Sequence, residues 1–316
     1  WFHIGQATTL CYIHTPIARS LIMLRLTKAD SFFIYACTLV VLLLFGSSGV
    51  RAGWQLVWDD EFNDATLNTN NWTYDTGNGF WVANPGYWVS GWGNNELENY
   101  TSRTQNVNLA NGCLHLRAQQ EAYGSQSYTS GRIKTKGIFS PTCGRFEFRA
   151  RLPAGAGLLP ALWMLPDNSP YGGWPNSGEI DVMENKGQTP TQVGGTIHYG
   201  GANGNDVYSG ATYTFSGGDS VTNFHTYAVE WTSNSISWYV DSNLYQTRNN
   251  WYANVGTTTG KYPYPAPFDQ PFYMLMNLAV GGNYLGNPAT NAINASLPGE
   301  MLVDYVRVYN WVSTPA

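Results

Sequence analysis

The sequence has few charged residues, and several motifs of common enzyme classes are missing from it. Charged side chains make up 12% of the 316 residues, and the net charge at pH 7 is −5. A chain without a basic surface is not expected to bind nucleic acid. No two histidines have the spacing of a metal site, and there is no Ser-His-Asp order, no P-loop and no Gly-x-Gly-x-x-Gly motif. Zinc, acyl-enzyme and nucleotide chemistry therefore have no support.

The sequence also lacks an apolar run as long as a transmembrane helix, which needs about 20 residues. Residues 32–45 are apolar, follow Arg25 and Lys28, and precede the small residues of 46–52. This order is typical of a secretory signal. A membrane anchor through 32–45 is the alternative.

These features predict where the mature protein begins. Met23 would give a signal of ordinary length, so the residues before it are interpreted as upstream translation. We expect residues 1–52 to be upstream and signal sequence, and residues 53–316 to form one secreted, extracellular domain. No internal repeat suggests a second domain.

Composition and patterning favour strands over helices. Aromatic residues make up 15% of the chain, with 34 glycines and 16 prolines, which suits many strands joined by tight turns. Residues 145–152 alternate apolar and charged side chains, as in a half-buried strand. No stretch has a convincing amphipathic helical pattern. We predict an all-β jelly-roll sandwich of two antiparallel sheets, in which a concave sheet face supplies a cleft.

Individual strand pairings can also be predicted. Residues 131–139 alternate like 145–152, and a short loop around Pro141 predicts a hairpin between them. Residues 226–231 and 235–241 predict a second hairpin. Residues 271–280 indicate a strand that is buried on both faces.

Two cysteines, Cys113 and Cys143, lie in the predicted mature domain. A secreted pair favours a disulfide. However, the predicted strands that carry them would be separated by a third strand, about 9 to 10 Å apart and beyond disulfide reach. The sequence leaves both outcomes open.

The most informative segment is residues 178–185, Gly-Glu-Ile-Asp-Val-Met-Glu-Asn. In a regular strand Glu179 and Asp181 share a face, but Glu184 would point into the core, where an unpaired carboxylate costs several kcal/mol. One extra residue in a β-bulge would return Glu184 to the common face. The two glutamate carboxyls would then lie about 5 Å apart, which is the spacing of a retaining glycosidase.

An acidic triplet on a strand is more often a solvated surface than an active site. Here Trp174-Pro175 lies just upstream, and an aromatic ring can pack against the apolar face of a sugar. Residues 71–101 form a long segment rich in aromatic residues, glycine and asparagine. The segment contains three tryptophans, Trp81, Trp88 and Trp92, which is more than a packed surface loop needs for its own structure.

Glu-Ile-Asp-Val-Met-Glu resembles the Glu-x-Asp-x-x-Glu signature of glycoside hydrolase family 16, in the bulged form of the laminarinase-like endo-β-1,3-glucanases. Weaker matches follow in the same order as in the family. They cover residues 58–62, the Gly-Asn-Asn-Glu-Leu stretch within 71–101, and residues 130–132, 144–153, 277–282 and 303–309.

The resemblance implies a concanavalin A-like sandwich with the catalytic cleft on its concave face, and it implies specific roles for several residues. Glu179 would be the nucleophile, Glu184 the acid/base, and Asp181 the residue that hydrogen-bonds and tunes the nucleophile. The residues that would bind substrate on the donor side are Trp163, Trp174, Asn94, Arg132 and His198. A lone histidine such as His198 is more often an ordinary strand residue, but we expect its strand to pair with the motif, which would turn the side chain toward the cleft.

Many members of the family carry a structural calcium, and the matching positions are Glu61, Gly112 and Asp304. Hard oxygen ligands suit Ca²⁺, although ordinary surface polar groups are an equal alternative. No cofactor is expected for catalysis. The expected partner is a β-glucan polysaccharide, and we expect a monomer.

The resemblance predicts a secreted retaining endo-β-glucanase that hydrolyses β-1,3 bonds of laminarin-type glucans. Because fold does not fix function, two other readings stay open. One is a transglycosylase or a hydrolase of another glucan or galactan. The other is a β-glucan-recognition protein without activity, which would not need both glutamates.

Overall fold

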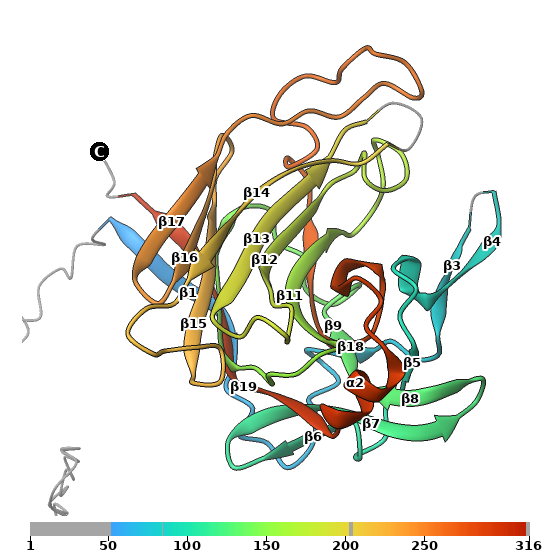
Figure 1. Cartoon of the computed structure of the whole chain (residues 1–316). Helices are drawn as coiled ribbons and strands as arrows, with labels where there is room; N and C mark the ends of the chain where they lie inside the picture. Colours follow the sequence, from blue (N-terminus) through green and yellow to red (C-terminus); the bar gives the residue numbers. More distant parts are fainter. Residues whose placement is uncertain (1–51, 84, 202–204, 314–316) are drawn as a thin grey trace, which may run out of the picture. The chain divides into compact units, whose positions relative to one another are not determined.

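The computed structural model describes residues 52–83, 85–201 and 205–313 (Figure 1). The predicted signal segment lies outside these ranges, apart from Ala52. Within the described residues, no helix combines the length and the apolarity that crossing a membrane would require.

Two large β-sheets make up the described part of the chain (Figure 1). The first has ten strands: β1 (Gly53–Asp60), β5 (Glu98–Tyr100), β6 (Val107–Ala110), β7 (Cys113–Tyr123), β8 (Gln126–Ser130), β10 (Gly144–Arg151), β15 (His225–Trp231), β16 (Ile236–Val240), β17 (Asn243–Arg248) and β19 (Gly299–Val312). Its main path runs β17-β16-β15-β10-β19-β7-β8-β5, with β1 paired to β19 and β6 to β7. All its pairs are antiparallel except β5 with β8.

The second sheet has seven strands in the order β14-β13-β12-β11-β18-β9-β2 and is antiparallel throughout. Its strands are β2 (Thr73–Tyr74), β9 (Arg132–Lys134), β11 (Leu158–Pro166), β12 (Glu179–Glu184), β13 (Gln192–Tyr199), β14 (Val207–Thr214) and β18 (Phe272–Val280). A separate hairpin consists of β3 (Gly79–Val82) and β4 (Tyr87–Ser90). Among the described residues the helices are short: η1 (Gly91–Gly93), η3 (Asn283–Leu285) and α2 (Thr290–Ala295).

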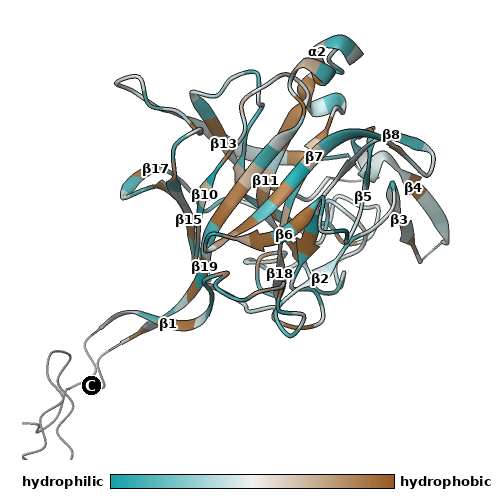
Figure 2. Ribbon diagram, turned by 90° about the horizontal axis from the view of Figure 1, so that it is seen from below, coloured by the Kyte–Doolittle hydropathy of each residue, from teal (hydrophilic) through white to brown (hydrophobic). Residues whose placement is uncertain are grey.

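The core lies between the two sheets and follows the period-2 pattern of the strands. In β10, Phe146, Phe148 and Ala150 are fully buried while the charged residues between them are partly exposed. The same alternation is visible along β7 in Figure 2. Every residue of β18 is buried, as a strand covered on both faces must be. The all-β prediction and the two stacked antiparallel sheets are thus confirmed.

The predicted hairpin between residues 131–139 and 145–152 is wrong. β9 pairs with β18 and β2 in the seven-stranded sheet, whereas β10 pairs with β15 and β19 in the other sheet. Residues 135–143 therefore cross from one sheet to the other. The hairpin predicted for residues 226–241 is confirmed as β15 and β16.

Cys113 and Cys143 are both free. They are indeed separated by a strand, but that strand is β19 rather than residues 131–139. Leu114 lies opposite Val303 of β19, while Arg145 lies opposite Tyr309. The two cysteines are thus displaced along β19 as well as across it, which puts them out of disulfide reach.

Candidate active site

The carboxylate motif forms β12, and the bulge predicted from its sequence is present. Asp181 and Glu184 lie opposite Trp163 and Ala161, which are only two positions apart on β11. On the other side, Val182 and Met183 together oppose Gly195 of β13. The extra residue restores the phase, so Glu184 shares a face with Asp181 and Glu179. We call this side of the seven-stranded sheet the carboxylate face.

Gly195 explains why the bulge fits at this position. A Cβ at residue 195 would come within 2.4 Å of the Trp238 ring and of the Tyr245 hydroxyl. Trp238 comes from β16 of the other sheet, and its Nε1 donates a hydrogen bond to the backbone oxygen of Asp181 at 2.8 Å. The bulge is therefore held from the core side by a residue of the opposite sheet.

Asp181 lies at the centre of the motif and is 2% exposed. Its Oδ2 is 3.3 Å from Nε2 of His198 on β13. The other imidazole nitrogen, Nδ1, contacts the Asp206 carboxylate at 2.9 Å. His198 thus bridges two aspartates. Burial opposes its charge, but the hydrogen bond and charge of Asp181, together with the charges of Glu179 and Asp206, raise the pKa of His198 to about 10.

Glu179 lies opposite His198 in the β12–β13 register. Its Oε2 accepts a hydrogen bond from Nε1 of Trp174 at 2.7 Å. Burial, and then the charge of Asp181, hold the pKa of Glu179 well above its usual range. The Trp174 donor and the His198 cation are the two groups that favour the ionised form of this carboxyl.

Glu184 lies at the other end of β12. Burial, followed by the charge of Asp181, raises the pKa of Glu184 to about 8, while a hydrogen bond with the Tyr284 hydroxyl works in the opposite direction. Glu184 therefore keeps its proton at neutral pH. A carboxyl group in this state can serve as a general acid.

The predicted substrate-binding residues fall on two flanks of β12. Trp174 and His198 lie on the side of β13, with their rings 5.8 Å apart. Trp163 lies on β11, where its Nε1 donates to Oδ1 of Asn277 at 2.7 Å. Trp174 is 53% exposed and can meet a ligand directly.

Arg132 is buried, with 7% of its surface exposed. Its Nε donates to Asp75 at 2.9 Å, and its guanidinium lies 4.4 Å from the ring of Trp92 and 4.9 Å from that of Trp163. Arg132 therefore makes cation–π contacts with both tryptophans while it pairs with Asp75. Sugar contact by Arg132 stays a prediction.

Asn94 fastens the end of the 71–101 segment to η3. Its Oδ1 accepts from the backbone N–H of Tyr284 at 2.9 Å, and its Nδ2 donates to Glu96 at 3.3 Å. Both ends of the side chain are thus engaged within the protein. Contact of Asn94 with substrate stays a prediction.

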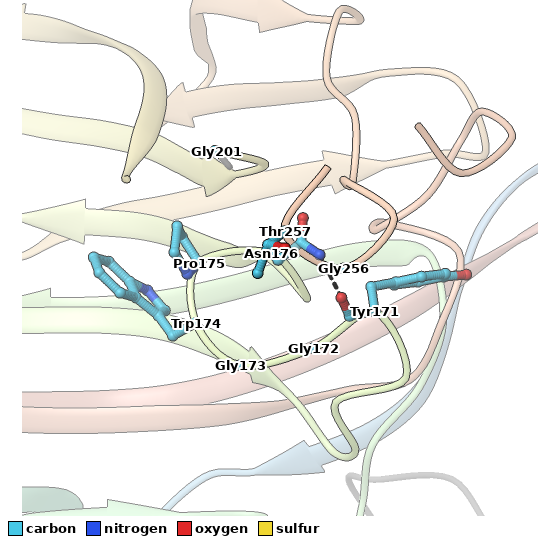
Figure 3. A pocket seen from close by; sticks show the side chains of 9 residues that line it. All are labelled: Tyr171, Gly172, Gly173, Trp174, Pro175, Asn176, Gly201, Gly256 and Thr257. Carbon is cyan, nitrogen blue, oxygen red and sulfur yellow. Dashed lines mark hydrogen bonds between the residues drawn. The ribbon is translucent and has the colours of Figure 1, made fainter. Parts of the chain in front are cut away.

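A pocket of about 350 Å³ adjoins the Trp174 flank (Figure 3). It is lined by Tyr171, Gly172, Gly173, Trp174, Pro175, Asn176, Gly201, Gly256 and Thr257. Asn176 closes its floor, because its Nδ2 donates to the carbonyl oxygen of Asn254 at 2.7 Å and its Oδ1 accepts from the Asn254 N–H at 2.6 Å. No carboxylate or cationic side chain lines this pocket, which suits a neutral ligand.

Glu179, Asp181 and His198 bring one possible ligand atom each to within 4.8 Å of one another. Burial lowers the pKa of His198, but the hydrogen bond and charge of Asp181 and the charges of Glu179 and Asp206 raise it to about 10, so its protonated form occupies this cluster at neutral pH. In this cluster the imidazolium is itself the cation.

The predicted calcium ligands converge at one place in the ten-stranded sheet. β7 pairs with residues 299–303 of β19, and β1 pairs with residues 306–312, so Asp304 lies between the two partners. Glu61 directly follows the end of β1 and Gly112 directly precedes β7, which brings both to the same place. Each carboxylate already has a cationic partner: Glu61 binds Arg307, with Nε donating to Oε1 at 2.7 Å, and Asp304 binds Arg149. The oxygen donors suit Ca²⁺, but both ion pairs would have to open.

Sequence reasoning missed three residues of the site: Tyr284, Asp206 and Trp238. Tyr284 lies two residues after the 277–282 segment that resembles the family. This closeness in sequence is the signal that could have pointed to Tyr284 as a site residue. Asp206 lies between β13 and β14 without a recognisable pattern. Trp238 looked like a core residue, which it is, and its bond to Asp181 depends on packing between sheets.

An antiparallel β-sandwich with a bulged Glu-x-Asp-x-x-Glu strand defines a class of carbohydrate-cleaving enzymes, and comparison with known proteins agrees. Residues 94–306 match the model of the Glycosyl hydrolases family 16. The glucan endo-1,3-beta-glucosidase A1 of Niallia circulans is 46% identical over 268 residues, covering 82% of this chain and 38% of that protein. A beta-glucanase of Rhodothermus marinus is 42% identical, covering 82% of this chain and 86% of the relative.

Solved structures give the same result. The laminarinase from Rhodothermus marinus superposes with a TM-score of 0.70 at 39% identity, covering 83% of this chain and 99% of that structure. The chain belongs to glycoside hydrolase family 16 and is a glycoside hydrolase.

Proposed function

We propose that this protein is a secreted, retaining endo-β-1,3-glucanase that cleaves internal bonds of laminarin-type β-glucans. The observation that carries the proposal is the placement of Glu179 and Glu184 on one face of a bulged strand, in different environments. Glu179 accepts from Trp174 and faces the His198 cation, whereas Glu184 holds a proton to about pH 8. The β-1,3 preference is supported by what the related enzymes are named for.

The mechanism we propose has two displacements. In the first, ionised Glu179 attacks the anomeric carbon as Glu184 gives its proton to the glycosidic oxygen, and the bond between that carbon and that oxygen breaks. In the second, Glu184 takes a proton from water, and the water oxygen displaces Glu179 from the anomeric carbon. Glu179 must lose its proton before it attacks, and His198 with Trp174 stabilises the resulting charge.

The decisive experiment is product analysis on laminarin, mixed-linkage glucan and agarose. We expect a ladder of oligosaccharides from laminarin, with much less product from the other two polymers. NMR of the first product should show the β-anomer. The α-anomer would mean inversion and would contradict the roles assigned to the glutamates.

The same experiment tests the two alternatives. When an oligosaccharide replaces the polymer as substrate, products longer than that oligosaccharide would reveal a transglycosylase, because a sugar hydroxyl can replace water in the second displacement. Binding of glucan without any product would identify a recognition protein. Secretion is tested separately: N-terminal sequencing of the exported protein should begin at Gly53, and a product that retains residues 1–22 would contradict the signal prediction.

A further inference from the structure

The β3–β4 hairpin carries a pair of tryptophans whose rings are largely in solvent. Trp81 and Trp88 lie directly opposite each other in the register, so both project from the same face of the ribbon. They are 62% and 49% exposed. Figure 1 shows the hairpin standing away from the two sheets. Burying such rings on folding would stabilise the protein, so their exposure is unusual and points to a ligand.

The opposite face of the hairpin is anchored to the body. Phe80 packs against Trp92, with ring centroids 6.2 Å apart. Backbone bonds fix the base of the hairpin, since the N–H of Gly91 donates to the carbonyl of Asn78 at 2.7 Å and that of Gly77 to Tyr100 at 2.9 Å. The hairpin is thus held at its base, and its tryptophan face is the more exposed one, although Phe80 and Tyr87 on the opposite face are also 41% and 50% exposed.

The hairpin is continuous with the carboxylate face. The Arg132 guanidinium contacts the ring of Trp92 and also the ring of Trp163. Trp163 in turn lies opposite Asp181 of the motif. Aromatic rings therefore link the catalytic strand, through Trp163, Trp92 and Phe80, to one face of the hairpin, and Trp81 and Trp88 project from the other face.

We propose that Trp81 and Trp88 form a binding surface for a neutral β-glucan chain beyond the catalytic residues, one that holds long polymers at the β9 end of the carboxylate face. Residues 77–93 contain no charged side chain, so a polyanion or an acidic peptide has nothing to pair with. Flat indole rings pack well against the apolar faces of pyranoses. The choice of a glucan rests on the proposed function and on the continuity with the carboxylate face.

Binding is best tested apart from catalysis. In a Glu179→Gln background, migration through native gels containing laminarin should be retarded, and Trp81→Thr/Trp88→Thr should weaken this retardation by about tenfold in affinity. Threonine preserves strand propensity, so the hairpin should persist. Trp81→Phe/Trp88→Phe should restore most of the binding. Trp311→Thr is the matched control, because Trp311 is 59% exposed but lies on β19 of the other sheet.

Activity gives a second readout. In the active enzyme, the threonine double variant should raise KM for long laminarin several-fold while leaving kcat/KM for a short oligosaccharide unchanged. If the threonine double variant is retarded as strongly as the parent in every polysaccharide gel, the proposal is overturned. It is also overturned if the double variant loses only self-association, measured by sedimentation, or only binding to neutral phospholipid vesicles. If the wild type binds laminarin through the hairpin yet forms no product, the proposed hydrolase activity fails while the binding surface stands.

Discussion

His198 lies opposite Glu179 on the neighbouring strand and is protonated at neutral pH because two aspartates hold it. Its charge lowers the pKa of Glu179 and of Glu184. The role implied for His198 was a contact with substrate. The structure adds an electrostatic role that a sequence position alone does not reveal.

Replacing His198 with glutamine should therefore move the acidic limb of the pH profile. Without the cation, Glu179 binds its proton more tightly, so a higher pH is needed to ionise the nucleophile. We expect the acidic limb of kcat/KM to shift upward and kcat to fall. The matched control is His115→Gln on β7 of the other sheet, which should leave the profile unchanged. An unshifted limb in the His198 variant would remove this electrostatic role.

Glu179→Gln and Glu184→Gln should each lower kcat by about three orders of magnitude or more, because each removes a group required in the transition state. Glucan binding should persist. Azide should rescue the alanine variants in opposite senses on an activated substrate, giving the α-azide with Glu179→Ala and the β-azide with Glu184→Ala. The same anomer from both variants would exclude the assigned division of roles.

Glu184→Gln should also stabilise the protein, and more so at pH 8 than at pH 5. The pKa of Glu184 is about 8 in the folded state, above the usual value of 4.5. As pH rises from 4.5 to 8, the unfolded chain releases this proton while the folded chain keeps it, so the free energy of unfolding falls. Glutamine has no such proton. Thermal melts of Glu184→Gln and the parent at the two pH values test this. Asp59→Asn is the control, because Asp59 is exposed. An equal gain in stability at pH 5 and pH 8 would contradict the prediction.

Arg132 should matter more for its shape than for its charge. Arg132→Lys keeps a cation beside Asp75 but loses the planar group stacked between Trp92 and Trp163. We expect this variant to raise KM for laminarin and to lower the free energy of unfolding by about 1 to 3 kcal/mol. Arg145→Lys is the control, since Arg145 lies 5.2 Å from the Tyr239 ring in the other sheet. It should lose stability without a change in KM.

If calcium binds between Glu61, Gly112 and Asp304, chelation should lower the melting temperature with little effect on activity at low temperature. The loss should disappear in Asp304→Asn, which removes one hard ligand. An identical melting curve with and without chelator would mean that no calcium binds here. Glu61 would then stay paired with Arg307, and Asp304 with Arg149.

The sequence alone determined the alternation of the main strands and the bulge of the motif, because both follow from local rules. Side chains alternate with period 2 along a strand, so the burial of Phe146 and Phe148 could be read directly. The same rule made Glu184 out of phase with Asp181 and required the bulge that the register contains. A turn of a few residues likewise fixed the β15–β16 hairpin.

Tertiary structure alone decided which strands became neighbours. Alternation in residues 132–134 and 144–151 is compatible with either sheet, and only closure of the whole sandwich places β9 beside β18 and β10 beside β19. That choice leaves Cys113 and Cys143 unpaired. It also buries Arg132 between two tryptophans and brings Asp206 to His198. These contacts join residues distant in sequence, so no local pattern encodes them.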